Sequence, residues 1–311
     1  MAQERKLFTL EAEDFREVSG PLDFNLTNDY MFKATLQENT EALKGLIGAL
    51  LRINPALLDI EVTNPILLGK SLENKDFYLD VKVLINGDKC INLEMQVENL
   101  GNWPERSLSY TTRAFDTLPK GESYENIMPI HHIGFVCFNV FKEHNILFDT
   151  FSLKNRDNSL IFTDKFMLSV VNLKQIDTAS EEDKQYKLDK WCRFITATTW
   201  EEIQELAKED PDMEATAETL FTLNTDFDAR ENAIRRKEYF DAINYKNKQI
   251  NQLDKVLIQK NTEITNMNKT ISDLDATIAV MDAEIADKDA AIADRDKIIE
   301  ELRKQLERAQ K

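Results

Sequence analysis

Polar and apolar residues alternate along residues 77–97, FYLDVKVLINGDKCINLEMQV. A period of two is typical of a β-strand with one covered face, because successive side chains point to opposite faces of the sheet. The stretch therefore predicts two strands joined by a tight turn at Asn86-Gly87. Three further apolar and aromatic runs predict strands at 131–141, 144–153 and 165–173.

Helical periodicity precedes and follows this hairpin. One helix is predicted to begin near Asp29, a second to end near Ile53, and a third to begin after Pro104. Residues 176–249 are acidic and have a helical pattern, with Pro211 separating two helices. Helices on both sides of a strand-rich region predict a mixed α/β fold with a helical extension.

A heptad repeat occupies the C-terminal part of the chain. From Ile250 to Leu306 every seventh residue is Ile or Leu. The alternating seam positions are Leu253, Lys260, Met267, Leu274, Met281, Lys288, Arg295 and Leu302. An unbroken register without Pro or Gly predicts a coiled coil over 250–311, and the Ile-rich seam beside Leu and Met favours a parallel homodimer. A lone helix with an exposed seam is the alternative.

These patterns divide the 311 residues into four segments, and composition agrees with them. The expected segments are a lead at 1–23, an α/β domain at 24–175, a helical extension at 176–249 and the coiled coil at 250–311. A hydrophobic fraction of 42% is ordinary for a chain with a packed core. The charged N-terminus and the lack of an apolar run of about 18 residues argue against a signal peptide and a membrane span. Three distant cysteines predict free, buried thiols and a cytoplasmic protein.

Charge limits the ways in which this chain can bind nucleic acid. It has 56 acidic and 39 Lys or Arg residues, a net charge of −17. Proteins that bind DNA usually present a basic surface to the phosphates. Any contact with DNA must therefore use a local patch, a metal ion or a partner.

Candidate chemistry is concentrated on the predicted hairpin. Asp80 and Lys82 share one face of the first strand, and Glu94 and Gln96 share one face of the second. A two-residue turn would place Asp80 opposite Leu93, so that the carboxylates point apart. A three-residue loop, or a β-bulge that shifts the pairing by one, would place Asp80 opposite Glu94. Carboxylates about 5 Å apart at their β-carbons can reach one cation.

Further polar residues surround this hairpin in the sequence. Arg106, Tyr110 and Arg113 share a face of the third predicted helix, where they suit either phosphate contact or ion pairing with nearby acids. His131 and His132 lack a metal-ligand spacing, so solvated or core-edge positions are expected for them.

Four pieces in this order resemble the PD-(D/E)XK nuclease family transposases, also described as recombination-promoting nucleases. They are NDYMFK at 28–33, FYLDVKV at 77–83, INLEMQV at 91–97 and ERSLSYTTRAF at 105–115. The resemblance covers residues 24–175, about half of the chain. It implies a restriction-endonuclease-like core, in which helices flank a central mixed sheet. Such a domain would cut DNA with Mg²⁺ or Mn²⁺.

The resemblance also implies roles for individual residues. Asp80 and Glu94 would hold the metal, and Gln96 stands where the wider superfamily has lysine, although glutamine is usual in this subgroup. Because glutamine is neutral, it can orient water but cannot supply charge, so Lys82 is a candidate for that role. Asp29 would add a metal contact, or it is simply a carboxylate favoured at a helix start.

Two functions follow from these residues. The first is a metal-dependent DNA endonuclease that dimerises through its coiled coil, and the intact set of Asp80, Glu94 and Gln96 favours it. The second is a catalytically weak or inactive nuclease fold that serves as an interaction protein through the same coiled coil. The acidic net charge favours this alternative.

Overall fold

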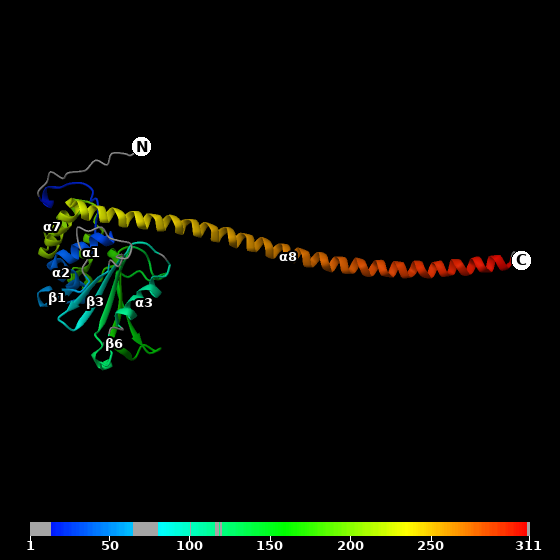
Figure 1. The fold of residues 1–311 in the computed structure, drawn as a ribbon, viewed down its shortest axis with the longest axis horizontal. Helices are drawn as coiled ribbons and strands as arrows, with labels where there is room; N and C mark the ends of the chain where they lie inside the picture. Colours follow the sequence, from blue (N-terminus) through cyan, green and yellow to red (C-terminus); the bar gives the residue numbers. More distant parts are fainter. Residues whose placement is uncertain (1–13, 65–79, 100, 116–117, 119, 310–311) are drawn as a thin grey trace. The chain divides into compact units, whose positions relative to one another are not determined.

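The computed structural model describes residues 14–64, 80–99, 101–115, 118 and 120–309 (Figure 1). The first three residues of the predicted hairpin, 77–79, lie outside the described residues. The chain divides into two units, Met1–Ala242 and Ile243–Lys311.

A six-stranded mixed sheet lies at the centre of the first unit, in the order β1-β2-β3-β4-β6-β5. Its strands are β1 (Ile60–Val62), β2 (Val81–Ile85), β3 (Lys89–Gln96), β4 (Ile130–Val136), β5 (Phe148–Lys154) and β6 (Ile161–Asn172). β3, β4 and β6 are mutually parallel, whereas β1, β2 and β5 pair antiparallel with their neighbours. The mixed sheet and its flanking helices confirm the predicted fold class.

The helices begin and end near the predicted residues. They are α1 (Asp29–Glu38), α2 (Thr40–Leu51), α3 (Trp103–Phe115), α4 (Glu181–Gln185), α5 (Leu188–Thr196), α6 (Trp200–Ala207), α7 (Pro211–Thr225) and α8 (Phe227–Ala309). Four short 3₁₀ helices connect them, η1 (Phe15–Glu17), η2 (Pro55–Leu57), η3 (Tyr124–Asn126) and η4 (Ile176–Thr178). The Asn28 side chain accepts the Met31 N–H and so caps α1. Pro211 occupies the first turn of α7, where its missing N–H costs nothing.

Side-chain alternation gives the sheet two different faces. The odd-numbered apolar residues of β3 and β4 belong to the main core, where Phe32 of α1 packs on Phe135 with ring centroids 5.4 Å apart. Even-numbered residues of the same strands face α3, which contacts β4 and β6. In Figure 1 the strands lie between α3 and the pair α1 and α2. The even-numbered face is the one that contains Asn92, Glu94 and Gln96.

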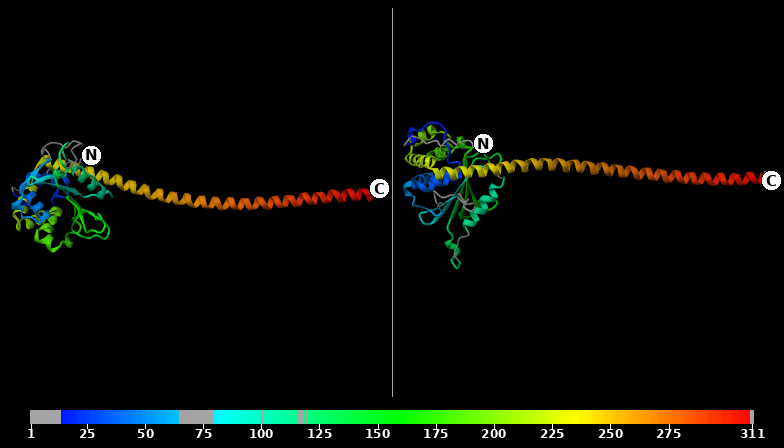
Figure 2. Two further views of the ribbon diagram at one scale, coloured as in Figure 1. Left: turned by 90° about the horizontal axis from the view of Figure 1, so that it is seen from below. Right: turned by 45° about the horizontal axis from the view of Figure 1, so that its top comes forward.

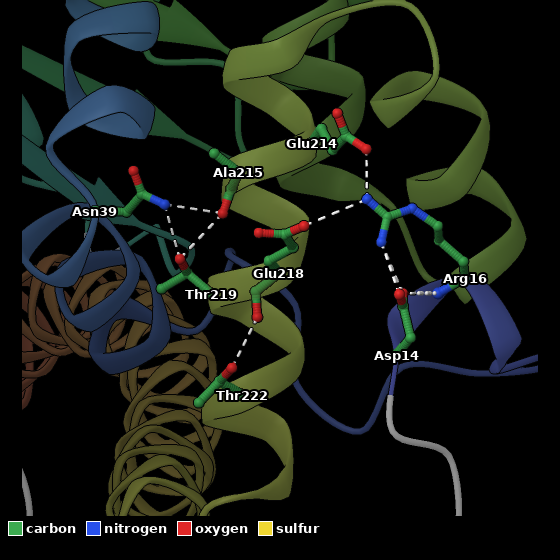
Figure 3. A network of polar contacts seen from close by, with 8 residues as sticks. All are labelled: Asp14, Arg16, Asn39, Glu214, Ala215, Glu218, Thr219 and Thr222. Atoms are coloured by element: carbon green, nitrogen blue, oxygen red, sulfur yellow. Dashed lines mark hydrogen bonds and ion pairs between the residues drawn. The ribbon is translucent and has the colours of Figure 1, made fainter.

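Helix α7 fixes the N-terminal segment and the junction between α1 and α2. Arg16, within η1, pairs with Glu214 and Glu218 of α7 (Figure 3). Asn39, between α1 and α2, donates to the Ala215 carbonyl and to Thr219 Oγ1, each at 2.9 Å. The helical extension is therefore part of the framework that holds α1 against the sheet.

The heptad segment forms part of one continuous helix, α8, in every view (Figure 2). Its seam residues are exposed in the single chain, as shown by Ile271 at 55% and Ile278 at 54%. The predicted helix is confirmed, whereas pairing with a second helix stays a prediction. Among the described residues, no helix has an apolar stretch long enough to cross a bilayer.

All three cysteines are free, as predicted. Cys192 is buried, but Cys90 and Cys137 are only half-buried. The expectation of buried thiols is therefore correct only for Cys192.

Candidate functional site

The loop of the hairpin decides where Asp80 lies. Asn86 and Gly87 both have positive φ, and the Asp88 N–H donates to the Ile85 carbonyl at 3.1 Å. The loop has three residues, 86–88, because Ile85 pairs with Lys89 and Asp88 is left between the strands. The structure thus has the longer of the two loop lengths.

This register brings Asp80 next to Glu94. Val81 pairs with Leu93, and the register continued by one residue sets Asp80 opposite Glu94. Lys82 pairs with Asn92, so Asp80 and Lys82 share the sheet face of Asn92 and Glu94. Asp80 itself precedes the strand and is half-buried, and its carbonyl accepts the Asn64 side-chain amide at 3.0 Å.

Glu94 is buried and lies between two nitrogen groups. Its Oε1 accepts from a guanidinium nitrogen of Arg106 at 2.7 Å, and its Oε2 lies 3.4 Å from His132 Nε2. Burial alone would raise the pKa of the Glu94 carboxyl, but His132 and Arg106 outweigh burial and lower the pKa. Glu94 is therefore held as a carboxylate.

His132 lies beneath this carboxylate and is completely buried. Because β3 and β4 are parallel with Asn92 opposite His132, the Asn92 amide reaches His132 Nδ1 at 3.0 Å. His131 points to the other face, where its Nε2 lies 2.7 Å from Ser169 Oγ. Both histidines belong to the interior, so the expectation of solvated or edge positions is wrong.

Helix α3 covers the site through Trp103 and Arg106. Gly134 is the neighbour of Glu94 on β4, and a β-carbon there would lie 2.3 Å from the Trp103 ring, so only glycine allows this contact. Arg106 also stacks on Tyr110, with its guanidinium carbon 5.4 Å from the ring centroid. Arg113 is exposed, and within the described residues it has no ion pair.

Asp29 is buried in a different ion pair. Its carboxylate accepts from Arg236 of α8, with Nε 3.0 Å from Oδ1 and a second, close contact from the other end of the guanidinium. The two residues are 207 positions apart in the chain. A contact between Asp29 and a metal stays a prediction, and such a contact would have to compete with Arg236.

Gln96 is buried at the end of β3, where its side-chain Nε2 donates to the Glu98 carbonyl at 2.8 Å. This bond holds the strand end and fixes the amide plane. The Gln96 Oε1 and the second N–H of Nε2 remain as the groups that can orient a water.

Lys33 is a charged residue of this region that the sequence pattern did not assign. It lies on α1, is 1% exposed, and is near enough for the charges of Asp80 and Lys82 to act on it. Burial lowers the pKa of Lys33 to about 8, and the Asp80 charge opposes this shift. The sequence NDYMFK contains a signal that could have identified Lys33, because a lysine among apolar residues of a buried helix is itself carried into the interior.

The donor set fits a hard cation that keeps most of its own water. Within the described ranges, no group of three or more His, Cys, Asp and Glu residues is arranged around a metal position. Mg²⁺, however, is usually held by one or two carboxylates together with water and substrate oxygens. Asp80 and Glu94 supply that number, and Glu94 Oε2 is buried without a hydrogen bond.

Comparison with known proteins was made at the level of families, curated proteins and solved structures. A family model described as PD-(D/E)XK nuclease family transposase matches residues 26–249. No curated protein and no solved structure matches significantly. The matched range is more than half of the 311 residues and includes the hairpin, α3 and the helical extension. The chain therefore belongs to the PD-(D/E)XK nuclease family transposases.

Proposed function

We propose that this protein is a Mg²⁺-dependent DNA endonuclease that hydrolyses phosphodiester bonds, with Mn²⁺ able to replace Mg²⁺. The main support is the register of β2 and β3, which brings Asp80 opposite Glu94 on one sheet face. Family membership implies a nuclease domain and DNA as its substrate.

The carboxylates of Asp80 and Glu94 would hold the metal. A bound Mg²⁺ would activate water and neutralise charge on the scissile phosphate. Asp80 is half-buried and Glu94 is buried, so one carboxylate can exchange with solvent while the other is fixed. Gln96 would orient the attacking water, because its bond to Glu98 fixes the amide and leaves Oε1 and one N–H for the water.

In the wider superfamily a lysine stands at the Gln96 position. Here a lysine from another part of the fold would supply the positive charge that Gln96 lacks. Lys82 shares the Asp80 face and is half-buried, whereas Lys33 approaches from α1 and is fully buried. A half-buried lysine can reach a phosphate, so Lys82 is the direct candidate. Lys33 would act on Asp80 from inside the fold.

Helix α3 would contact the DNA backbone. Arg106, Tyr110 and Arg113 lie on the helix that covers the site, and Arg113 is exposed. Arg106 would contact phosphate only after releasing Glu94, with which it forms an ion pair. A local patch of this kind is compatible with a net charge of −17.

The exposed seam of α8 would pair two copies of the chain over 250–311. An isolated helix with Ile and Leu more than half exposed along its length leaves apolar surface in water, and a second helix would remove it. This seam and the acidic charge also favour the second candidate function, an inactive nuclease fold that acts as an interaction protein.

Nicking of supercoiled plasmid DNA in Mg²⁺ by the full-length protein separates the two functions. We expect the wild type to nick, and Asp80→Ala to lose at least about 10³-fold because several kcal/mol of transition-state stabilisation depend on the metal. Glu231→Ala, which removes an exposed carboxylate from α8, is the matched control and should nick normally. Equal nicking by wild type and Asp80→Ala would favour the interaction protein.

Lys82→Ala tests the origin of the missing charge in the same assay. If Lys82 supplies it, the rate should fall by about 10²-fold, as for loss of one transition-state donor. An unchanged rate would remove Lys82 from the mechanism.

A further inference from the structure

We propose that His132, held by Asn92, is a positioning residue for Glu94. It directs its Nε2–H at Glu94 Oε2 while Arg106 donates to Oε1, and so holds the carboxylate in one orientation. This inference rests on the proposed function, because it assigns a role within the same metal site.

Strand pairing builds the arrangement. Asn92 lies opposite His132 and Glu94 lies opposite Gly134 in the parallel ladder between β3 and β4. Gly134 has no side chain to separate His132 from Glu94, and the Trp103 ring closes the space above it. The imidazole ring is 6.3 Å from the Trp103 ring between centroids, so its orientation is confined.

The position of the ring proton follows from the partners. Glu94 is an acceptor only, because it is a carboxylate paired with Arg106. Its Oε2 is 3.4 Å from His132 Nε2, and two acceptors facing each other in a buried site would repel. In this assignment Nε2 carries the proton and Nδ1 accepts from the Asn92 amide N–H at 3.0 Å.

The two atoms at this contact, His132 Nε2 and Glu94 Oε2, have no other hydrogen-bond partner among the described residues. A buried polar atom without a partner costs about 1–3 kcal/mol, so each atom is the partner that the other requires.

His131 shows that packing alone does not require this arrangement. It is adjacent on β4, nearly as buried at 4% exposure, and points to the opposite face, where its Nε2 meets the Ser169 hydroxyl, which in turn contacts Thr150. A histidine whose only role is structural has neutral hydroxyl partners of this kind. His132 instead has a carboxylate that the register brings beside Asp80.

Binding of Mn²⁺ to the full-length protein, measured by calorimetry and electron paramagnetic resonance, tests the role directly. We expect His132→Leu to weaken Asp80-dependent Mn²⁺ binding by about 10- to 100-fold, the usual cost of losing a group that orients a metal ligand. His132→Gln, which keeps an N–H donor, should recover part of that loss. His131→Gln is the matched control, and it should bind Mn²⁺ as the wild type does even if it unfolds at a lower temperature.

Nuclear magnetic resonance of the imidazole nitrogens gives a readout that needs no metal. The chain has only three histidines, so the His131→Gln and His132→Gln spectra assign the signals. We expect His132 to carry its proton on Nε2. A proton on Nδ1, or wild-type Mn²⁺ affinity in a folded His132→Leu variant, would overturn the positioning role alone. No Mn²⁺ binding by the wild type would overturn the proposed metal site and this inference together.

Discussion

The two units of this chain use burial in opposite ways. The first unit, Met1–Ala242, buries charged side chains, with Lys33 at 1%, Glu94 at 7% and Arg236 at 5% exposure. The second unit, Ile243–Lys311, leaves a row of Ile and Leu exposed, most of them by more than half. Each arrangement is costly for a chain in isolation, since buried charge loses hydration and exposed apolar surface orders water.

The difference indicates what each unit requires. In the first unit the charges are compensated internally, as in the Asp29–Arg236 and Glu94–Arg106 pairs. In the second unit the seam residues are exposed in the single chain, so the proposed pairing with a second copy is what would cover them. The first unit therefore compensates its costly groups internally, whereas the second depends on the proposed association.

The largest effect on stability is expected at the buried Asp29–Arg236 pair. Arg236→Met leaves the Asp29 carboxylate buried without its cation, and the free energy of unfolding should fall by about 3–5 kcal/mol. Arg235→Met removes the neighbouring exposed pair with Glu231 and should cost less than about 0.5 kcal/mol. Urea unfolding of both variants measures the difference. Equal losses would show that burial of charge is not what distinguishes the first unit.

Titration of His131 should make the free energy of unfolding fall as the pH is lowered. Burial, together with the charge of Lys89, lowers its pKa from 6.5 to about 3 in the folded protein. The unfolded chain therefore binds the proton first, so the stabilisation is complete above about pH 6.5 and is lost as pH falls from 6.5 towards 3. At pH 4.5 the loss from this group should be about 2–3 kcal/mol relative to neutral pH.

His131→Gln removes this titration and should flatten the dependence between those pH values. Urea unfolding of the variant and the wild type at a series of pH values separates this slope from any constant loss of stability. A parallel pair of curves would contradict the expectation that His131 stays neutral inside the first unit.

A smaller effect is expected at the seam of α8. Ile278→Lys places a charge at the centre of the apolar row and should raise the dissociation constant of the dimer by at least about 10-fold. Ala279→Lys adds the same charge one position away from the seam and should leave the dimer intact. Light scattering after size-exclusion chromatography gives the mass of each variant. A monomeric wild type would remove the second copy as the partner of α8.

Sequence periodicity predicted the elements well, because periodicity depends on the side chains of each segment alone. The heptads gave α8, Pro211 gave the start of α7, and alternation gave β2 and β3. Asp80 and Glu94 were identified from the sequence as candidate metal ligands, but residues 86–88 allowed two loop lengths. One length sets the two carboxylates on the same sheet face, and the other sets them on opposite faces. The extra residue, Asp88, decides the register, and no local preference in Asn86-Gly87 required it.

Contacts between distant segments were not predictable in the same way. Asn92 and His132 are 40 positions apart, and Lys33 reaches the Asp80 region only because α1 packs on β2 and β3. The histidines were misplaced for this reason, since a sequence run does not reveal that both neighbouring strands will be covered. Arg236 could be recognised as basic but not as the partner of Asp29.

The sequence by itself determined the local structure, the membership of a nuclease family and the identity of the acidic residues, because each of these is written in short runs of side chains. Tertiary structure decided which oxygen of Glu94 meets Arg106, which histidine lies beneath it and which charge is buried with which partner. Those outcomes depend on how strands pair and helices cover them, and the free energy of a buried charge is set by neighbours that the chain brings together only on folding.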